Sequence, residues 1–210
     1  MTTSAPTTPR PRGPYAKTAQ VRQRILEASA IVFAASGFAA ATMKEVAERA
    51  GISERGLVHH FASKAELLAA VLEKREAENT ARIPLVAGSD VLLAMVAIVE
   101  SDSLDPSIVE LHSMISAEAA SADHPAHTHY RQRYELVREF TERSFGELRR
   151  MGRLESGLTD QELAAMFIAL SDGLQLQWLY DRESVQSAAL LRRFLESLTP
   201  SLSRPAETRP

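Results

Sequence analysis

The residues best suited to chemistry lie mid-chain, where histidines and carboxylates gather between positions 112 and 129. Imidazole and carboxylate can hold zinc or nickel without cysteine, which would make the chain a metal-dependent hydrolase. Helical spacing argues against this, because His127 and His129 point in different directions on a helix that begins near Pro125. We therefore expect surface histidines and no metal. The cluster comprises His112, Glu118, Asp123, His124, His127 and His129.

A second group of residues suits nucleic-acid recognition. Two short helical segments, 43–50 and 54–60, are joined by a turn at Gly51, and Leu57 and Phe61 anchor the second segment. An ordinary helical hairpin with a polar face would show the same spacing. The outer face of the second segment carries side chains that suit phosphates and base edges: Ser53, Arg55, Gly56 and His59. We predict that this face enters a major groove.

Charge is divided unevenly along the chain and supports the DNA-binding interpretation. The 210 residues carry a net charge of −3, but residues 1–64 carry nine Lys or Arg against four Glu, and the remainder is acidic. A basic N-terminal part suggests that residues 1–64, and not the rest of the chain, bind a polyanion. The absence of cysteine excludes disulfides and thiol nucleophiles, and no apolar run approaches the roughly 18 residues of a membrane span. We expect a cytoplasmic protein without a cofactor.

The later part of the chain offers apolar and aromatic residues with a few polar ones, a mixture typical of small-molecule pockets. Such residues at helical spacing are more often ordinary core, and we expect two or three of them to line a cavity. No phosphate-binding glycine loop and no convincing nucleophile–base pair accompanies them, so we expect no enzyme activity. The candidate ligand-binding residues are His112, Met114, Tyr134, Phe140, Phe167, Gln175 and Trp178.

The elements that must position all these residues are helical. Apolar residues recur at three- and four-residue spacing nearly throughout, so the sequence predicts an all-α fold of about nine helices. Capping boxes headed by Thr42, Ser63 and Thr159 mark three helix starts. A first helix is expected to begin near Lys17 and to end at Gly37.

One run, residues 42–68, holds caps, turn and anchors in a single register: Thr-Met-Lys-Glu-Val-Ala-Glu-Arg-Ala-Gly-Ile-Ser-Glu-Arg-Gly-Leu-Val-His-His-Phe-Ala-Ser-Lys-Ala-Glu-Leu-Leu. It resembles the DNA-binding signature of the TetR family of bacterial repressors, and the resemblance covers residues 18–78. The second half resembles actinobacterial members more loosely. The family often has Thr where this chain has Gly56, and Tyr where it has Val58, so two hydroxyl contacts are missing.

The resemblance implies a homodimer whose N-terminal helices bind an operator and whose body binds a small molecule that weakens DNA binding. By motif position, Thr42 and Lys64 would hold phosphates, and His60 belongs to the closing His-Phe pair. The implied DNA-binding set is Thr42, Ser53, Arg55, Gly56, His59, His60 and Lys64.

These observations together predict how the chain is organised and what it does. The predicted units are a disordered arm over 1–16, a helix-turn-helix domain over 18–78, a ligand-binding and dimerisation domain over 79–199, and a flexible tail over 200–210. The leading hypothesis is a homodimeric repressor that a small apolar ligand releases from its operator. The alternatives are a His/carboxylate metal-dependent hydrolase, and a ligand-independent DNA binder or activator of the same fold.

The dimer contact is expected in the last two long helices, at about 160–180 and 185–198. The second of these helices has apolar side chains at helical spacing. They form more apolar surface than packing within one monomer would bury. They are Leu190, Leu191, Phe194, Leu195 and Leu198.

Overall fold

The computed structural model describes residues 14–84 and 87–199, and these residues are all-α, which confirms the predicted fold class. Their nine helices are α1 (Pro14–Ala40), α2 (Met43–Ala50), α3 (Glu54–His60), α4 (Lys64–Thr80), α5 (Ser89–Asp102), α6 (Pro106–Glu118), α7 (His127–Arg150), α8 (Asp160–Tyr180) and α9 (Ser187–Leu198). No helix in these two ranges is long and apolar enough to cross a membrane.

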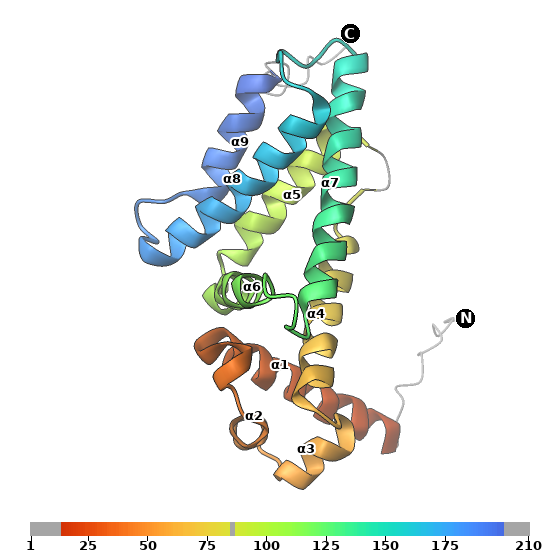
Figure 1. Cartoon of the computed structure of the whole chain (residues 1–210), viewed down its shortest axis with the longest axis vertical. Coiled ribbons are helices and arrows are strands. Elements are labelled where there is room, and N and C mark those ends of the chain that lie inside the picture. The colour runs from red at the N-terminus through yellow and green to blue at the C-terminus, as the bar shows by residue number, and fades with distance from the viewer. Residues whose placement is uncertain (1–13, 85–86, 200–210) are drawn as a thin grey trace, which may run out of the picture.

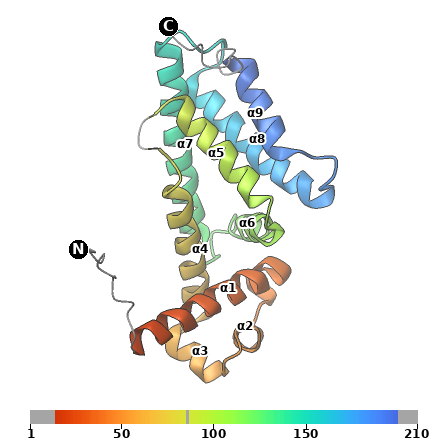
Figure 2. The ribbon, with the colours of Figure 1, turned by 180° about the vertical axis from the view of Figure 1, so that it is seen from behind.

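The helices form a small unit and a taller body, joined by α4 (Figure 1). The small unit, called the head below, consists of α1 to α3 and the start of α4. Helices α5 to α9 form the body, and α6 lies across the top of α1 in both views (Figures 1 and 2). Most of the predicted arm, residues 1–13, and the predicted tail lie outside the described residues. Residues 14–16 are helical, and Pro14 suits a first helical turn because its φ is already fixed.

Helix starts follow the predicted capping signals closely. Thr42 and Thr159 each cap a helix in a complete capping box with the glutamate three residues on. The third box differs: Ser63 Oγ accepts from the Glu66 amide, but the Glu66 carboxylate accepts from the amide of Ala62 at 2.8 Å. The carboxylate thus reaches one residue further back and stabilises the turn that leads into α4.

The sequence predicts that the first helix ends at Gly37. The helix bends at this residue, but helical structure resumes beyond it. Its φ is +73°, a conformation that favours glycine, and α1 continues to Ala40. The bend exposes the amide of Phe38, and this N–H donates to Glu118 Oε2 at 2.6 Å. The body therefore hydrogen-bonds the end of α1 through a residue 80 positions away.

Two hydrophobic cores hold the head and the body. The head core contains Phe33, Leu57 and Phe61, all fully buried, and extends upward to Ile115 of α6. The body core joins α5, α7, α8 and α9. Its largest buried side chains include Leu92, Phe145, Leu148, Leu163, Phe167 and Leu195. Because α6 and α7 also reach the head core, the two units share packing rather than a flexible linker.

Candidate functional site

The two short helices of the head pack as a helix-turn-helix. Gly51 has φ +67° and ψ +38°, the left-handed conformation that ends α2 and turns the chain into α3. Ala47 is buried where α2 meets its neighbours, and Leu57 and Phe61 fix α3 in the head core. These contacts leave the opposite face of α3 free of the core.

That free face carries the predicted recognition residues. Ser53, Arg55 and His59 are exposed and Gly56 is half-buried. Ser53 Oγ caps α3 by accepting from the Gly56 amide at 3.1 Å, and its O–H remains able to donate. Exposed Val58 adds an apolar contact surface. The face thus combines a guanidinium, an imidazole and a hydroxyl donor, the groups that contact base edges and phosphates.

The hydroxyl of Thr42 is already engaged at the start of α2. It donates to Glu45 Oε2 at 2.8 Å and accepts from the Glu45 amide at 3.2 Å. These hydrogen bonds from Thr42 hold the pKa of Glu45 below its ordinary value. The Glu45 carboxylate therefore occupies the helix start where the sequence predicts a phosphate, and a phosphate at Thr42 would have to displace it.

Lys64, for which the family resemblance implies a phosphate contact, has three carbonyl partners in the head. Its ammonium donates to the carbonyls of Phe38 at 2.6 Å, Ala39 at 3.2 Å and Ala41 at 2.7 Å. It also lies 4.5 Å from the centre of the Phe38 ring. All three N–H donors of the ammonium thus hold the end of α1, and none is left over for a phosphate.

Arg22, a residue that the sequence analysis missed, contacts both His60 and Phe61 at the end of α3. The His60 ring is half-buried and 5.7 Å from that of His59. Arg22 of α1 stacks on the Phe61 ring at 4.2 Å and donates to the carbonyl of His60 at 3.5 Å. Arg22 therefore joins α1 to the end of α3. Its place in the first-helix run Arg22-Gln-Arg-Ile-Leu gave no sign of this long-range contact.

The body contains a cavity of about 180 Å³ between α4, α5, α6, α7 and α8. Four of the seven predicted ligand-binding residues line it: His112, Tyr134, Phe140 and Gln175. Helix α4 contributes a wall that the sequence analysis did not assign to a pocket, formed by its last three turns from Leu72 to Thr80. A cavity with a largely apolar lining and a few polar groups is the usual form of a small-molecule site.

The other three predicted residues lie outside the lining of this cavity. Met114 is exposed on α6. Phe167 packs edge-on against Phe145 in the body core, with ring centres 6.3 Å apart. Trp178 is buried with Arg182 over its ring at 5.1 Å. Apolar side chains repeat at the same helical spacing whether they fill a core or border a void, and the sequence cannot separate these cases.

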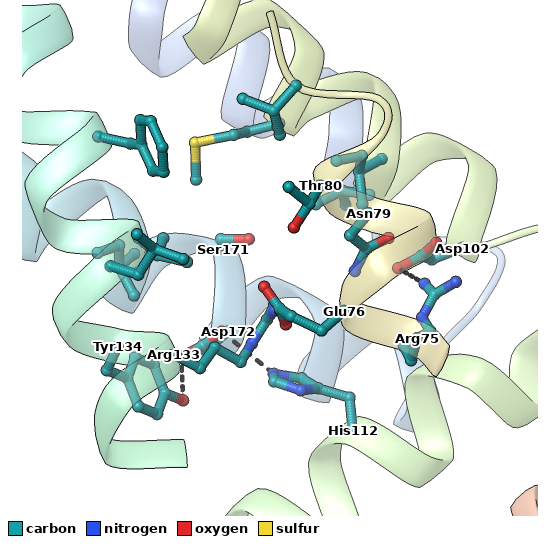
Figure 3. Close-up of a pocket in the computed structure, with 18 of the residues that line it drawn as sticks. Arg75, Glu76, Asn79, Thr80, Asp102, His112, Arg133, Tyr134, Ser171 and Asp172 are labelled. Carbon is teal, nitrogen blue, oxygen red and sulfur yellow. Dashed lines mark hydrogen bonds and ion pairs between the residues drawn. The ribbon is translucent and has the colours of Figure 1, made fainter. Parts of the chain in front are cut away.

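Charged and polar side chains from α4, α5, α6, α7 and α8 surround one part of the cavity (Figure 3). Asp172 accepts from the Tyr134 hydroxyl at 2.8 Å and lies 3.5 Å from His112 Nε2. Burial raises the pKa of Tyr134 above its ordinary value, and the Asp172 carboxylate adds to the rise. Tyr134 therefore stays a neutral phenol that donates to Asp172.

Two ion pairs lie among these side chains. Arg133 of α7 pairs with Glu76 of α4 at 2.5 Å, and Arg75 of α4 pairs with Asp102 at the end of α5 (Figure 3). Both pairs are largely shielded from solvent. They hold α4 against α5 and α7, so a molecule that enters the cavity touches the groups that fix the position of α4.

The histidines considered as metal ligands have separate partners. His127 Nδ1 lies 2.8 Å from the carbonyl oxygen of Ala119, and His129 packs edge-on against Tyr130. His124 lies 3.7 Å from Glu118 and edge-on to Phe38. The described residues contain no group of three or more His, Asp or Glu placed to hold a metal.

His124 and Glu118 belong instead to the contact between body and head. Glu118 accepts from the Phe38 amide, and a Cβ added to Gly37 would lie 2.4 Å from Glu118 Oε1. Burial lowers the pKa of His124, an effect that the nearby Glu118 carboxylate partly opposes. This contact joins α6, which also lines the cavity, to the bend in α1.

Comparisons with known proteins agree with this architecture. Residues 25–71 match the family model "Bacterial regulatory proteins, tetR family", and residues 91–200 match "BetI-type transcriptional repressor, C-terminal". The chain is 39% identical over 61 residues to the regulator SrpR of Pseudomonas putida, a match that covers 29% of each chain. It is 26% identical over 194 residues to the repressor KstR2 of Rhodococcus jostii, covering 88% of this chain and 92% of that one.

A solved structure extends the comparison to the fold. The complex of SmeT with triclosan matches with a TM-score of 0.72 and 20% identity, covering 91% of this chain and 98% of that one. SmeT represses a multidrug efflux pump of Stenotrophomonas maltophilia. The helix-turn-helix, the helical body and the two family models together show that this chain belongs to the TetR family of bacterial transcriptional regulators.

Proposed function

We propose that the protein is a homodimeric repressor that releases its operator when a small amphipathic molecule occupies the body cavity. The observation that carries this proposal is the course of α4. Its first residue, Lys64, holds the end of α1 in the head, and its last turns, with Arg75, Glu76 and Asn79, wall the cavity. One rigid helix therefore touches both the DNA-binding unit and the ligand site.

The recognition face is the exposed side of α3, with Arg55 and His59 as the groups that read base edges. Ser53 supplies a donor to the backbone at the start of the helix. The basic charge of residues 1–64 supports this assignment, since phosphates dominate the affinity of such proteins for DNA. Such a regulator acts in the cytoplasm, where a bacterial operator lies.

The dimer contact uses mainly α8. Met166, Leu176 and Tyr180 are exposed by 49%, 48% and 87%, and they lie on one stripe of the helix. In α9, Leu191 and Leu195 are buried in the body core, Phe194 and Leu198 are partly buried, and Leu190 is exposed, so α9 adds a smaller apolar surface. Exposed apolar patches of this kind mark interaction sites, and a two-fold pair would double the DNA that is read.

An oligomer measurement tests this contact. Light scattering at micromolar concentration should give a dimer for the wild type and a monomer for Leu176→Arg, because the new charge would be buried at the interface. Gln161→Arg, an exposed change in the first turn of the same helix, should leave the dimer intact. A wild-type monomer would contradict the assignment.

Coupling would arise because a ligand in the cavity favours one position of α4 and α6. Helix α6 lines the cavity with Leu111 and His112, and its end holds Phe38 through Glu118. A shift of either helix would change the spacing of two recognition helices across a dimer, so the DNA-bound population would fall. Allosteric coupling of about 1–3 kcal/mol corresponds to a 5- to 150-fold loss of affinity.

The test begins with an operator isolated from random duplexes by repeated selection on the protein. Fluorescence anisotropy then measures operator affinity against a panel of small apolar compounds. We expect at least one compound to weaken binding within the range above. A compound that occupies the cavity without changing operator affinity would show a binding site that does not control DNA binding.

A further inference from the structure

The lining of the cavity is polar at one end and apolar at the other, so an amphipathic ligand would bind in one orientation. Helix α5 lines it with Val91, Met95 and Ile98 and then ends in Asp102, while α7 runs the other way, from Arg133 to Phe140. The polar end therefore lies toward the head and the apolar end away from it. Figure 3 shows the labelled polar side chains on α4, at the end of α5, and on the parts of α6, α7 and α8 that face α4.

Among the described residues that line the polar end, neither guanidinium is free to pair with an anionic ligand. Both guanidiniums in the lining are paired, Arg75 with Asp102 and Arg133 with Glu76. The third carboxylate of the lining, Asp172, faces His112 and the Tyr134 hydroxyl. A carboxylate or phosphate ligand would have to break an ion pair and would meet three carboxylates at close range.

Two buried acceptors at this end have no partner. Asn79 Oδ1 and Asp102 Oδ1 are fully shielded from solvent, and neither accepts a hydrogen bond from any described residue. Arg75 Nη2 is equally shielded and makes no hydrogen bond, but it is ion-paired with the other oxygen of Asp102, Oδ2. A buried acceptor without a donor is costly, and such groups in folded proteins usually meet water or a ligand. Both residues line the cavity, so a turn of either side chain would present its free acceptor to a donor inside it.

From these observations, and resting on the proposed function, we infer the chemical class of the effector. It is an amphipathic molecule whose polar end donates hydrogen bonds, a hydroxyl or a protonated amine, to the acceptors of Asn79 and Asp102. Its apolar part extends toward Met95 and Phe140. Molecules that end in a carboxylate or phosphate are rejected, although their apolar parts fit equally well.

The size of the cavity limits the apolar part. A cavity of roughly 150 Å³ can bind benzene. This one, at about 180 Å³, accommodates an aromatic ring with a short chain. Phenylbutanol, phenylbutylamine and phenylbutanoate share one such skeleton and differ only at the polar end. Differences in their affinities therefore report on the polar group and not on how the apolar part fits.

Calorimetric titration of the full chain with these three compounds tests the inference. We expect the alcohol and the amine to bind, and the carboxylate to bind at least tenfold more weakly. If the amine binds more tightly than the alcohol, the charge of Asp102 adds to the hydrogen bond. If the two bind equally, the hydrogen bond that both can donate accounts for their affinity. A carboxylate that binds as tightly as the alcohol overturns the inference, and so does the failure of all three to bind.

Two variants locate the effect. Asn79→Leu keeps the number and branching of the side-chain heavy atoms and removes one acceptor, so it should weaken the alcohol at least fivefold and leave the carboxylate unchanged. Met95→Leu alters the apolar end and should keep the order of the three compounds. Unfolding curves check that both variants fold. If a variant does not fold, the order of affinities measured with the wild type still tests the inference.

Operator release separates this inference from the proposed function. If the carboxylate binds best and releases the selected operator, the ligand class is wrong and the ligand-responsive regulator stands. If the alcohol binds as expected without any effect on the operator, the ligand class holds and the regulatory function fails.

Discussion

Replacing Lys64 by methionine should destabilise the head without removing a DNA contact. Methionine keeps the length of the side chain and removes the ammonium, so the carbonyls of Phe38, Ala39 and Ala41 lose their shared donor. The wild-type ammonium also lies over the Phe38 ring. The change therefore isolates the capping role that the structure gives to this residue.

The expected cost follows from the number and setting of these bonds. A hydrogen bond to a charged group contributes about 1.5–3 kcal/mol. Two of the three carbonyls are partly buried, whereas the exposed carbonyl of Ala39 can turn to water. With the half-buried ammonium discounted for solvent, the loss should be about 2–4 kcal/mol.

Urea unfolding followed by circular dichroism measures this cost, with Lys44→Met as the matched control. Lys44 is exposed on α2 and lies 3.9 Å from Glu48, so its loss should change stability by less than about 0.5 kcal/mol. The salt dependence of operator binding should keep its slope in Lys64→Met. An unchanged unfolding midpoint, with a slope reduced by about one unit, would refute this reasoning and restore the phosphate contact.

Three further changes test the head and its contact with the body. Gly37→Ala should lower the melting temperature, because φ is +73° there and the new Cβ would meet Glu118, whereas Gly157→Ala has open space and should not. Arg55→Ala should cost about 1–3 kcal/mol of operator binding and relax specificity at particular base pairs. An equal loss on operator and random DNA would place Arg55 on the backbone instead. Burial lowers the pKa of His124, so the unfolded state takes up a proton first and stability falls as the pH drops below about 6.5. His124→Asn should flatten that fall in urea midpoints measured across this range, and an unchanged pH dependence would assign it to other groups.

Local features of the fold could be predicted from the sequence because their causes lie within a few residues. The capping boxes at Thr42 and Thr159 and the turn at Gly51 are examples. Even Ser63 was recognised as a cap, although the Glu66 carboxylate bonds a different amide. Helix periodicity supplied the rest of the all-α fold.

The long-range contacts had no such signal. The bond from Phe38 to Glu118 spans 80 residues, and the carbonyl partners of Lys64 depend on where the bend at Gly37 places the end of α1. Likewise, the wall that α4 gives the cavity depends on how the helices cross. His112 and Trp178 were equally good candidates in sequence, and only their packing distinguishes them.

The most direct test of the central claim is to measure one ligand's affinity with and without DNA. The compound that best releases the selected operator is titrated calorimetrically into the free protein and into the protein saturated with operator. Linkage requires the two binding events to weaken each other equally. We predict that operator lowers the affinity for the compound by the same 5- to 150-fold factor. An affinity that is identical in both titrations would contradict the claim that the cavity controls DNA binding.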